Sequence, residues 1–174
     1  MPSNSPCVFK YNNFLKKILS HSFASLSYIV FICTVFVVGG QCHAKPESAA
    51  SILIIESDGT AQKFVVELAV SRSQKSIGLM YRRSLPQKNG MLFVYKTRSK
   101  ISMWMKNTYL ALDMLFIDTK GRINYIHEGA VPLSEKLITG KFPARAVLEL
   151  NAGIVSRFGF KVGDLVRHSI FGNE

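Results

Sequence analysis

A single apolar block divides this chain and limits what can fold after it. Residues 23–38 read FASLSYIVFICTVFVV, three lysines and no acidic residue precede them, and small residues follow as far as Ala44. A basic region, an apolar stretch and small residues in succession are the pattern of a secretory signal peptide. We therefore expect residues 1–44 to be a targeting segment, residues 45–50 a linker and residues 51–174 one folded domain.

The fate of the targeting segment has three readings. Cleavage after Ala44 would use Cys42 and Ala44 as the small residues that a signal peptidase selects. Cys42 could instead be a lipoprotein cysteine, although Gln41 stands where a small residue belongs. The block could also stay uncut as an inner-membrane tether over residues 23–40, although a spanning helix needs about 20 apolar residues. Because the lysines precede the block, each reading places the domain outside the cytoplasm, periplasmic or extracellular.

The cysteines and the charges are divided by this boundary. Cys7, Cys33 and Cys42 all lie before Lys45, so the mature domain has no disulfide, thiolate nucleophile or zinc–cysteine site. The residues from Lys45 onward hold 19 basic and 11 acidic side chains, a net charge of +8. This charge could steer the domain to an anionic membrane or cell-wall surface, or could serve solubility alone. We expect no nucleic-acid partner for an exported protein.

Short β-branched and aromatic runs recur after the linker, separated by turn signals such as Asp58-Gly59 and Asn89-Gly90. A capping box at Ser71–Gln74 predicts one helix from Arg72 to about Met80, and Gly78 in it predicts a close backbone approach. Strands and helices do not alternate repeatedly along the chain, so the sequence gives no indication of a parallel sheet. The pattern predicts a mainly β fold, an antiparallel sandwich or barrel with one short helix packed on it. The predicted strands are residues 51–56, 61–70, 91–95, 101–105, 113–118, 122–127, 144–150 and 162–169.

Four segments, GLMYRRSL, NGMLFVY, MWMKNTYLALDMLFID and VLELNAG, resemble the domain-of-unknown-function 192 family in order and spacing. The resemblance covers residues 51–170, with Ala111 standing where the family usually has proline. It implies an exported or membrane-tethered bacterial domain with a compact jelly-roll fold. It implies no established chemistry.

The residues that stand out for binding lie between Arg82 and Asp113. Strand alternation places Trp104 opposite Met103 and Met105, as a stacking platform or as a core tryptophan. The next three residues, from Lys106 to Thr108, are polar and form either a ligand-binding rim or a locally bonded turn. A carboxylate at the start of an apolar run needs a partner, and for Asp113 an arginine is the natural one. The predicted ligand-binding set is Arg82, Arg83, Trp104, Lys106, Asn107 and Asp113.

Other residues supply alternatives to this set. Glu149 could be a second carboxylate near Asp113, and two carboxylates can hydrolyse a glycoside. The methionines could bind Cu(I) or fill the core, and the core is the commoner use. His127 and His168 lack metal-ligand spacing, and no nucleophile, phosphate-loop or dinucleotide motif is present, so we expect no metal and no cofactor. The methionines concerned are Met80, Met91, Met103, Met105 and Met114.

These features predict a domain that binds a small molecule or a cell-envelope polymer without evident catalysis. A hydrolase of cell-wall or sugar substrates is the first alternative, and it requires the Asp113 and Glu149 carboxyls to share one cleft. A protein-interaction module of the envelope is the second, and it requires an exposed apolar patch.

Overall fold

The protein is seen here in a computed structural model that describes residues 50–174. The predicted signal segment and nearly all of the predicted linker lie outside this range, so the structure does not test the predictions made for them. Within residues 50–174, no helix is long and apolar enough to cross a membrane.

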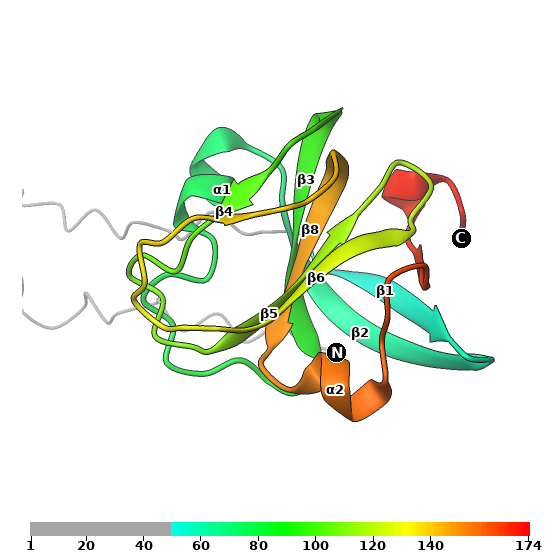
Figure 1. Cartoon of the computed structure of the whole chain (residues 1–174), viewed down its shortest axis with the longest axis horizontal. Helices are drawn as coiled ribbons and strands as arrows, with labels where there is room; N and C mark the ends of the chain where they lie inside the picture. Colours follow the sequence, from blue (N-terminus) through cyan, green and yellow to red (C-terminus); the bar gives the residue numbers. More distant parts are fainter. Residues whose placement is uncertain (1–49) are drawn as a thin grey trace, which may run out of the picture. The chain divides into compact units, whose positions relative to one another are not determined.

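Seven strands form one sheet, in the spatial order β6-β5-β8-β3-β2-β1-β9. The remaining strands, β4 (Ser102–Met103) and β7 (Ile138–Thr139), pair in a separate ribbon. Two short helices, α1 (Arg72–Ile77) and α2 (Ile154–Phe158), lie at different ends of the sheet (Figure 1). A 3-10 turn, η1 (Ser169–Phe171), ends the described fold. The strands of the sheet are β1 (Ala50–Ser57), β2 (Thr60–Ala69), β3 (Asn89–Ser99), β5 (Leu112–Ile117), β6 (Ile123–Ala130), β8 (Ala144–Asn151) and β9 (Leu165–Arg167).

The prediction of a purely antiparallel sheet is wrong at one pair of strands. β2 and β3 run parallel, with Val66 opposite Gly90, while the other paired strands are antiparallel. Parallel neighbours need a long crossover connection, and the segment that contains α1 supplies it. A single crossover leaves no repeating signal in the sequence, so the sequence pattern did not reveal it.

The sheet curls until its two edge strands meet at one end. Arg122, just before β6, bridges Leu165 of β9, and the Ile123 amide donates to the Asp164 carbonyl oxygen at 3.0 Å. The mainly β prediction is therefore confirmed. The described strands form a curled half-barrel with an added ribbon rather than two facing jelly-roll sheets.

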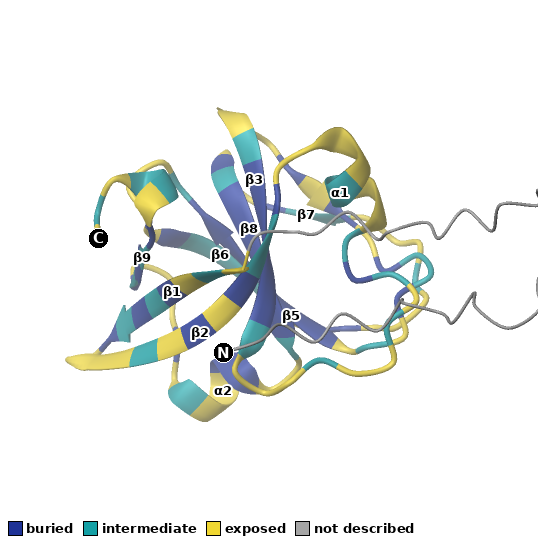
Figure 2. Ribbon diagram, turned by 180° about the vertical axis from the view of Figure 1, so that it is seen from behind, coloured by how far each residue is buried: buried dark blue, intermediate teal, exposed yellow. Residues whose placement is uncertain are grey.

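Strands β5 and β8, and β3 over residues 90–94, are buried on both faces (Figure 2). One core fills the concave side and includes Phe64, Leu115, Leu148 and α2 residue Val155. The second core lies on the other side under the ribbon and the end of α1. Side chains alternate between the two cores along each central strand, so a residue's position in the strand decides which core it faces. The second core contains Leu79, Met91, Phe93, Met103, Met105, Met114 and Val147 among others.

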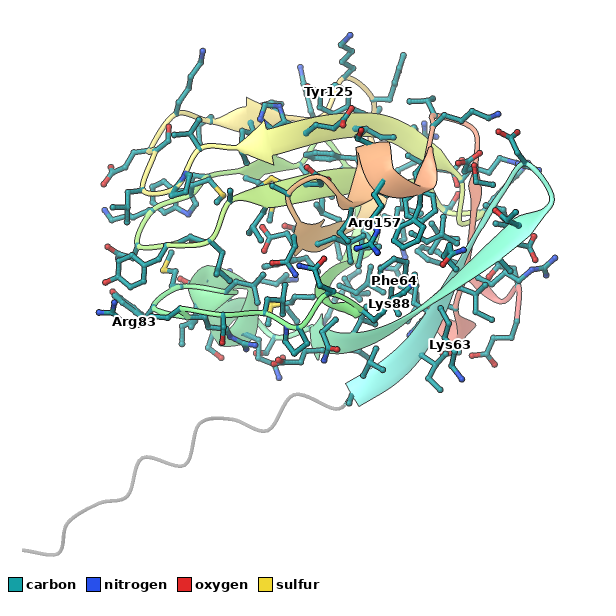
Figure 3. All side chains as sticks on the ribbon, turned by 90° about the horizontal axis from the view of Figure 1, so that it is seen from below. Lys63, Phe64, Arg83, Lys88, Tyr125 and Arg157 are labelled. Atoms are coloured by element: carbon teal, nitrogen blue, oxygen red, sulfur yellow. The ribbon has the colours of Figure 1, made fainter. Side chains whose placement is uncertain are left out.

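Aromatic rings close the concave core near α2. The Phe64 ring lies 6.2 Å from the Phe158 ring and 6.1 Å from the Phe160 ring, both edge-on. The Lys88 ammonium covers this cluster, 4.1 Å from the Phe158 ring centroid. Figure 3 shows Lys88 and Arg157 beside Phe64. This end of the core is thus sealed by aliphatic and cationic side chains.

The capping box predicted for α1 is confirmed. The Ser71 hydroxyl accepts from the Gln74 amide at 3.1 Å, and the Gln74 side chain accepts from the Ser71 amide at 2.9 Å. The helix ends earlier than predicted, at Ile77, because Gly78 takes a left-handed φ of 49°. A Cβ at Gly78 would lie 2.9 Å from the Phe93 ring, which confirms the predicted close approach. This packing lets the residues after α1 lie directly against the sheet.

Candidate functional site

Trp104 and the polar residues after it lie together at the surface. The Trp104 side chain is 43% exposed, whereas Met103 and Met105 are buried on the opposite side, as strand alternation predicted. The Lys106 ammonium lies 5.2 Å from the Trp104 ring centroid and 3.5 Å from a Glu135 carboxylate oxygen. Trp104 is therefore a surface side chain and not the core tryptophan of the alternative reading.

Asn107 holds this segment to the residues after α1. The Thr108 amide donates to the Met105 carbonyl oxygen at 3.0 Å, which closes a turn with Asn107 at a left-handed φ of 54°. Asparagine tolerates this conformation better than most residues. The Asn107 side-chain amide donates to the Tyr81 hydroxyl at 2.9 Å, and the Tyr81 amide donates to the Asn107 carbonyl oxygen at 2.9 Å. The segment is thus a bonded turn that also fixes the position of Trp104.

The predicted pairing of Asp113 with an arginine is wrong. Asp113 is fully buried, and its two carboxylate oxygens accept from the amides of Gly129 at 2.9 Å and Val155 at 3.0 Å. Arg82 instead forms a two-bond pair with Glu67 on β2. Arg83 lies 5.6 Å from the Tyr109 ring centroid, at the outer edge of the molecule (Figure 3). Backbone amides therefore satisfy the buried carboxylate that an arginine was expected to balance.

Asp113 and Glu149 lie on opposite faces of the sheet. Glu149 of β8 is aligned with Met114 of β5, whereas Asp113 is aligned with Leu150. Aligned residues share a face and adjacent residues point to opposite faces. Asp113 accordingly reaches α2 in the concave core, and Glu149 points into the other core. The two carboxyls share no cleft, so the hydrolase alternative built on this pair is wrong.

A small cavity opens where α1, β3, β8 and the Trp104 segment meet. Its volume is about 30 Å³. A cavity needs roughly 10–15 Å³ on this measure to hold one water, so there is room for a group of about two non-hydrogen atoms. Apolar side chains form most of the wall, Trp104 stands at the surface, and Glu149 contributes a carboxyl. The lining residues are Lys75, Ser76, Ile77, Gly78, Leu79, Met80, Phe93, Met103, Trp104, Thr108 and Glu149.

Glu149 has no polar partner among the described residues. Its side chain is only 4% exposed. No described cation lies within ion-pair distance of its carboxyl, and no described group hydrogen-bonds to it. Burial alone raises the pKa of Glu149 to about 8. A buried carboxyl without a partner is unusual, because burial of a charge is unfavourable unless the charge is paired.

The neighbouring titratable groups bond to partners other than this carboxyl. The Lys75 ammonium donates to the Val94 carbonyl oxygen at 3.0 Å and lies 4.5 Å from the Tyr95 ring centroid. Burial lowers the pKa of Lys75, and the charges of Lys96 and Arg145 lower it further. Burial also raises the pKa of Tyr95, with a smaller contribution from the negative charge of Glu149. Lys75 thus borders the cavity without neutralising Glu149.

The methionines serve mainly as core side chains, which is the commoner of the two uses considered from the sequence. Four of the five named methionines lie in the second core, and Met80 borders the cavity beside them. Among residues 50–174, no group of three histidine, cysteine or acidic side chains is placed to hold a metal ion.

His168 and Ser51 form a buried pair whose protonation pattern does not suit catalysis. His168 Nε2 lies 2.8 Å from the Ser51 hydroxyl, and Nδ1 accepts from the Ile170 amide at 3.2 Å. Because Nδ1 accepts, the neutral ring carries its proton on Nε2 and donates to the serine. Burial lowers the pKa of His168, which favours this neutral form. A histidine that donates to the serine cannot take its proton, so the pair holds β1 to the C-terminal turn.

The structure brings together only part of the predicted ligand-binding set. Trp104, Lys106 and Asn107 are neighbours, while Asp113 faces the other core and Arg82 is occupied by Glu67. The predicted ligand-binding set did not include Lys75, Met80 or Thr108, although all three line the cavity. One signal was available: Glu149 is the only charged residue in the run AVLEL, which reads as a strand buried on both faces.

The whole described fold also matches a family model. The model, named DUF192 and described as "Uncharacterized ACR", matches residues 53–168. The chain belongs to the DUF192 family. This confirms the resemblance drawn from the four sequence segments. No curated protein shows a significant match to the chain.

Two solved structures are similar to this DUF192 chain. A protein from Sinorhizobium meliloti 1021, provisionally described as a transcription regulator, is 45% identical, with a TM-score of 0.71. The match covers 72% of this chain and 98% of that one. A protein of unknown function from Novosphingobium aromaticivorans DSM 12444 is 31% identical, with a TM-score of 0.69, over 72% of this chain and 90% of that one. Neither comparison assigns a reaction or a ligand.

Proposed function

We propose that this DUF192 domain is an exported binding module that takes one end of a small molecule or envelope polymer into the cavity beneath Trp104, without catalysing a reaction. The observation that carries the proposal is Glu149, a buried carboxyl without a partner that lines a cavity open to the surface. Ligand sites commonly combine apolar walls with a few placed polar groups. Buried polar groups in native proteins nearly always have a hydrogen-bond partner, so an unpartnered one points to a functional role or a bound group.

The size of the cavity limits how a ligand can bind. About 30 Å³ admits a terminal group and not a whole sugar ring. Trp104 lines the cavity and is partly exposed, so it offers apolar contact to the rest of the ligand. The turn bonded through Asn107 and Tyr81 holds the indole in place, which reduces the entropy lost when a ligand binds.

The methionine methyl groups allow a direct test of the binding site. In the full chain labelled with ¹³C at its six methionine methyls, fragments of envelope polymers should shift the Met80 and Met103 signals. They should also change the emission of Trp104, which is the only tryptophan in the sequence. Met105 is fully buried and does not line the cavity, so its signal should change least.

A matched pair of variants locates the site. Ser76→Phe places a ring at the edge of the cavity and should weaken binding at least about tenfold, since a phenyl group exceeds the free volume. Arg72→Phe adds the same ring to an exposed position on the same helix, away from the cavity, and should leave affinity within about twofold. Equal effects of the two variants, or a library in which no member shifts Met80 or Met103, would contradict the proposed function.

Export is part of the proposal, with the domain periplasmic or held at the inner membrane by residues 23–40. Its support is the lysine-flanked apolar block and the absence of cysteine after Cys42. When the full chain is expressed in a Gram-negative bacterium, the periplasmic fraction should contain a protein whose mass corresponds to an N-terminus at Lys45. Retention of the uncut chain in the membrane would instead support the tether, and a cytoplasmic protein would contradict export.

We do not extend a regulatory role from the Sinorhizobium relative to this chain. Of the described elements, the two α-helices contain six and five residues, short for a helix that reads the major groove. The net charge of +8 after residue 44 suits an anionic membrane or cell-wall surface as the partner of an exported domain. Retention on anionic vesicles that is lost at high salt would support this surface role.

A further inference from the structure

The Glu149 carboxylate has no positively charged partner in the cavity, and this indicates which kind of ligand the cavity would bind. Glu149 lies in an apolar wall formed by Leu79, Met80, Phe93 and Met103, where water solvates a carboxylate poorly. The cations that border the region have other partners: Lys75 donates to Val94 and Lys106 pairs with Glu135. Arg145, four residues earlier on β8, is not in ion-pair contact with Glu149 either. The cavity therefore holds an anionic group without a counter-charge among the described residues.

We propose that the cavity beneath Trp104 binds a protonated primary amine, whose ammonium group pairs with the Glu149 carboxylate. This inference rests on the proposed function and names the class of ligand. An ammonium with its first methylene has two non-hydrogen atoms, which matches a cavity of about 30 Å³. The amine would thus be unhindered and carried on a chain, as in an alkylamine or a lysine side chain.

The walls of the cavity suit this ligand. Methionine sulfur and the aromatic faces of Phe93 and Trp104 are polarisable surfaces, and aromatic faces attract cations. The Trp104 and Tyr95 rings already face lysine ammonium groups at 5.2 and 4.5 Å. The methylenes that follow the ammonium would pass between Met80 and Trp104 toward solvent, where the remainder of the ligand would lie.

Binding of this ligand is coupled to the protonation of Glu149. Because burial raises the pKa of Glu149 to about 8, an ammonium binds only after the carboxyl has lost its proton. The ionised fraction rises from about 1% at pH 6 to about 50% at pH 8, so affinity should rise about 50-fold over this interval. A primary amine stays protonated up to about pH 10, so its own titration does not enter. Lys75 and Tyr95 are the nearest other titratable groups: burial lowers the pKa of Lys75 and raises the pKa of Tyr95.

The experiment is a titration of the ¹³C-methionine-labelled full chain with ethylammonium at pH 6, 7 and 8, in phosphate buffer. Ethylammonium should shift Met80 and Met103 with an affinity that rises with pH as stated. Ethanol, which is neutral and of similar size, and tetramethylammonium, which has the same charge and no N–H, should each bind at least tenfold more weakly. Nα-acetyl-lysine should bind as ethylammonium does, because it carries the same unhindered ammonium on a chain.

Variants assign the effect to Glu149. Glu149→Gln should weaken ethylammonium at pH 8 by at least about 30-fold and abolish the pH dependence. Glu135→Gln removes an exposed carboxylate beside Lys106 and should leave affinity within twofold. Unchanged affinity in the Glu149 variant, or affinity independent of pH, would overturn the inference. Equal binding of ethanol would overturn it and leave the proposed function standing. If nothing binds at the cavity, both fail.

Discussion

Replacement of Glu149 by glutamine is expected to stabilise the protein at alkaline pH. The carboxyl has no polar partner among the described residues, and burial holds its pKa at about 8. The difference between this value and the ordinary 4.5 corresponds to at most about 5 kcal/mol for the ionised form. At pH 9 the amide should recover a few kcal/mol of that energy, because glutamine carries no charge to desolvate. Urea unfolding of the full chain and the variant, in borate buffer free of amines, measures the gain.

The sign of the pH dependence follows from proton linkage. The folded state binds more protons than the unfolded state between pH 4.5 and about 8, so the contribution of Glu149 to stability declines as pH rises through this interval. His168 acts in the opposite direction below pH 6.5, where burial lowers its pKa. Because both proteins contain His168, its contribution cancels when the unfolding free energy of the variant is subtracted from that of the wild type. The difference should be near zero at pH 4.5, grow to pH 8 and then level off.

Glu135→Gln is the matched control for the stability measurement, because Glu135 is exposed and pairs only with an exposed lysine. Surface substitutions of this kind change stability by about 0.5 kcal/mol or less. A Glu149 variant that is less stable than the wild type at pH 9 would show that the carboxylate has a stabilising partner.

Asp113→Asn is expected to have the opposite effect and to destabilise the protein at pH 7 by about 3–5 kcal/mol. Each carboxylate oxygen of Asp113 accepts one buried backbone amide, from Gly129 and from Val155. Asparagine has one acceptor oxygen, so its NH₂ group faces one of these N–H groups without a bond. A hydrogen bond to a charged group contributes about 1.5–3 kcal/mol, and an unsatisfied buried donor costs about 1–3 kcal/mol. Urea unfolding monitored by circular dichroism measures the loss.

Asp118→Asn provides the comparison for Asp113. Asp118 also accepts two backbone amides, from Lys120 and Arg122, but both bonds use a single oxygen in an exposed turn. Asparagine keeps that oxygen, so the variant should lose less than about 1 kcal/mol. If Asp113→Asn lost no more than Asp118→Asn, the two buried amides would not depend on the carboxylate, and our account of how α2 is held to the sheet would be wrong.

Much of the fold followed from local rules. Two-residue alternation placed Trp104 opposite Met103 and Met105, and the capping box located the start of α1. The run at residues 91–95 was predicted as a strand and forms part of β3, where residues 91–94 are buried. The family resemblance rested on quoted segments and was confirmed by the match over residues 53–168.

The candidate site was less predictable, because its parts meet only in the folded chain. The alternation rule shows that Glu149 and Leu148 face opposite ways, but it does not show which face is covered by α1. The pairing of Asp113 with Arg82 or Arg83 was inferred from charge. The fold instead placed Glu67 against Arg82 and two backbone amides against the Asp113 carboxylate. Charge complementarity indicates that a partner is needed, whereas strand order and register decide which group provides it.

The sequence by itself determined the mainly β class, the approximate positions of most strands, the absence of thiols after Cys42 and the family, because these depend on residue type and short-range period. Only the tertiary structure decided that β2 and β3 run parallel and that the sheet curls until β6 and β9 meet. It also decided that two carboxylates on neighbouring strands face different cores, one held by amides and one unpaired. These features depend on contacts between residues far apart in the chain, which local patterns do not encode.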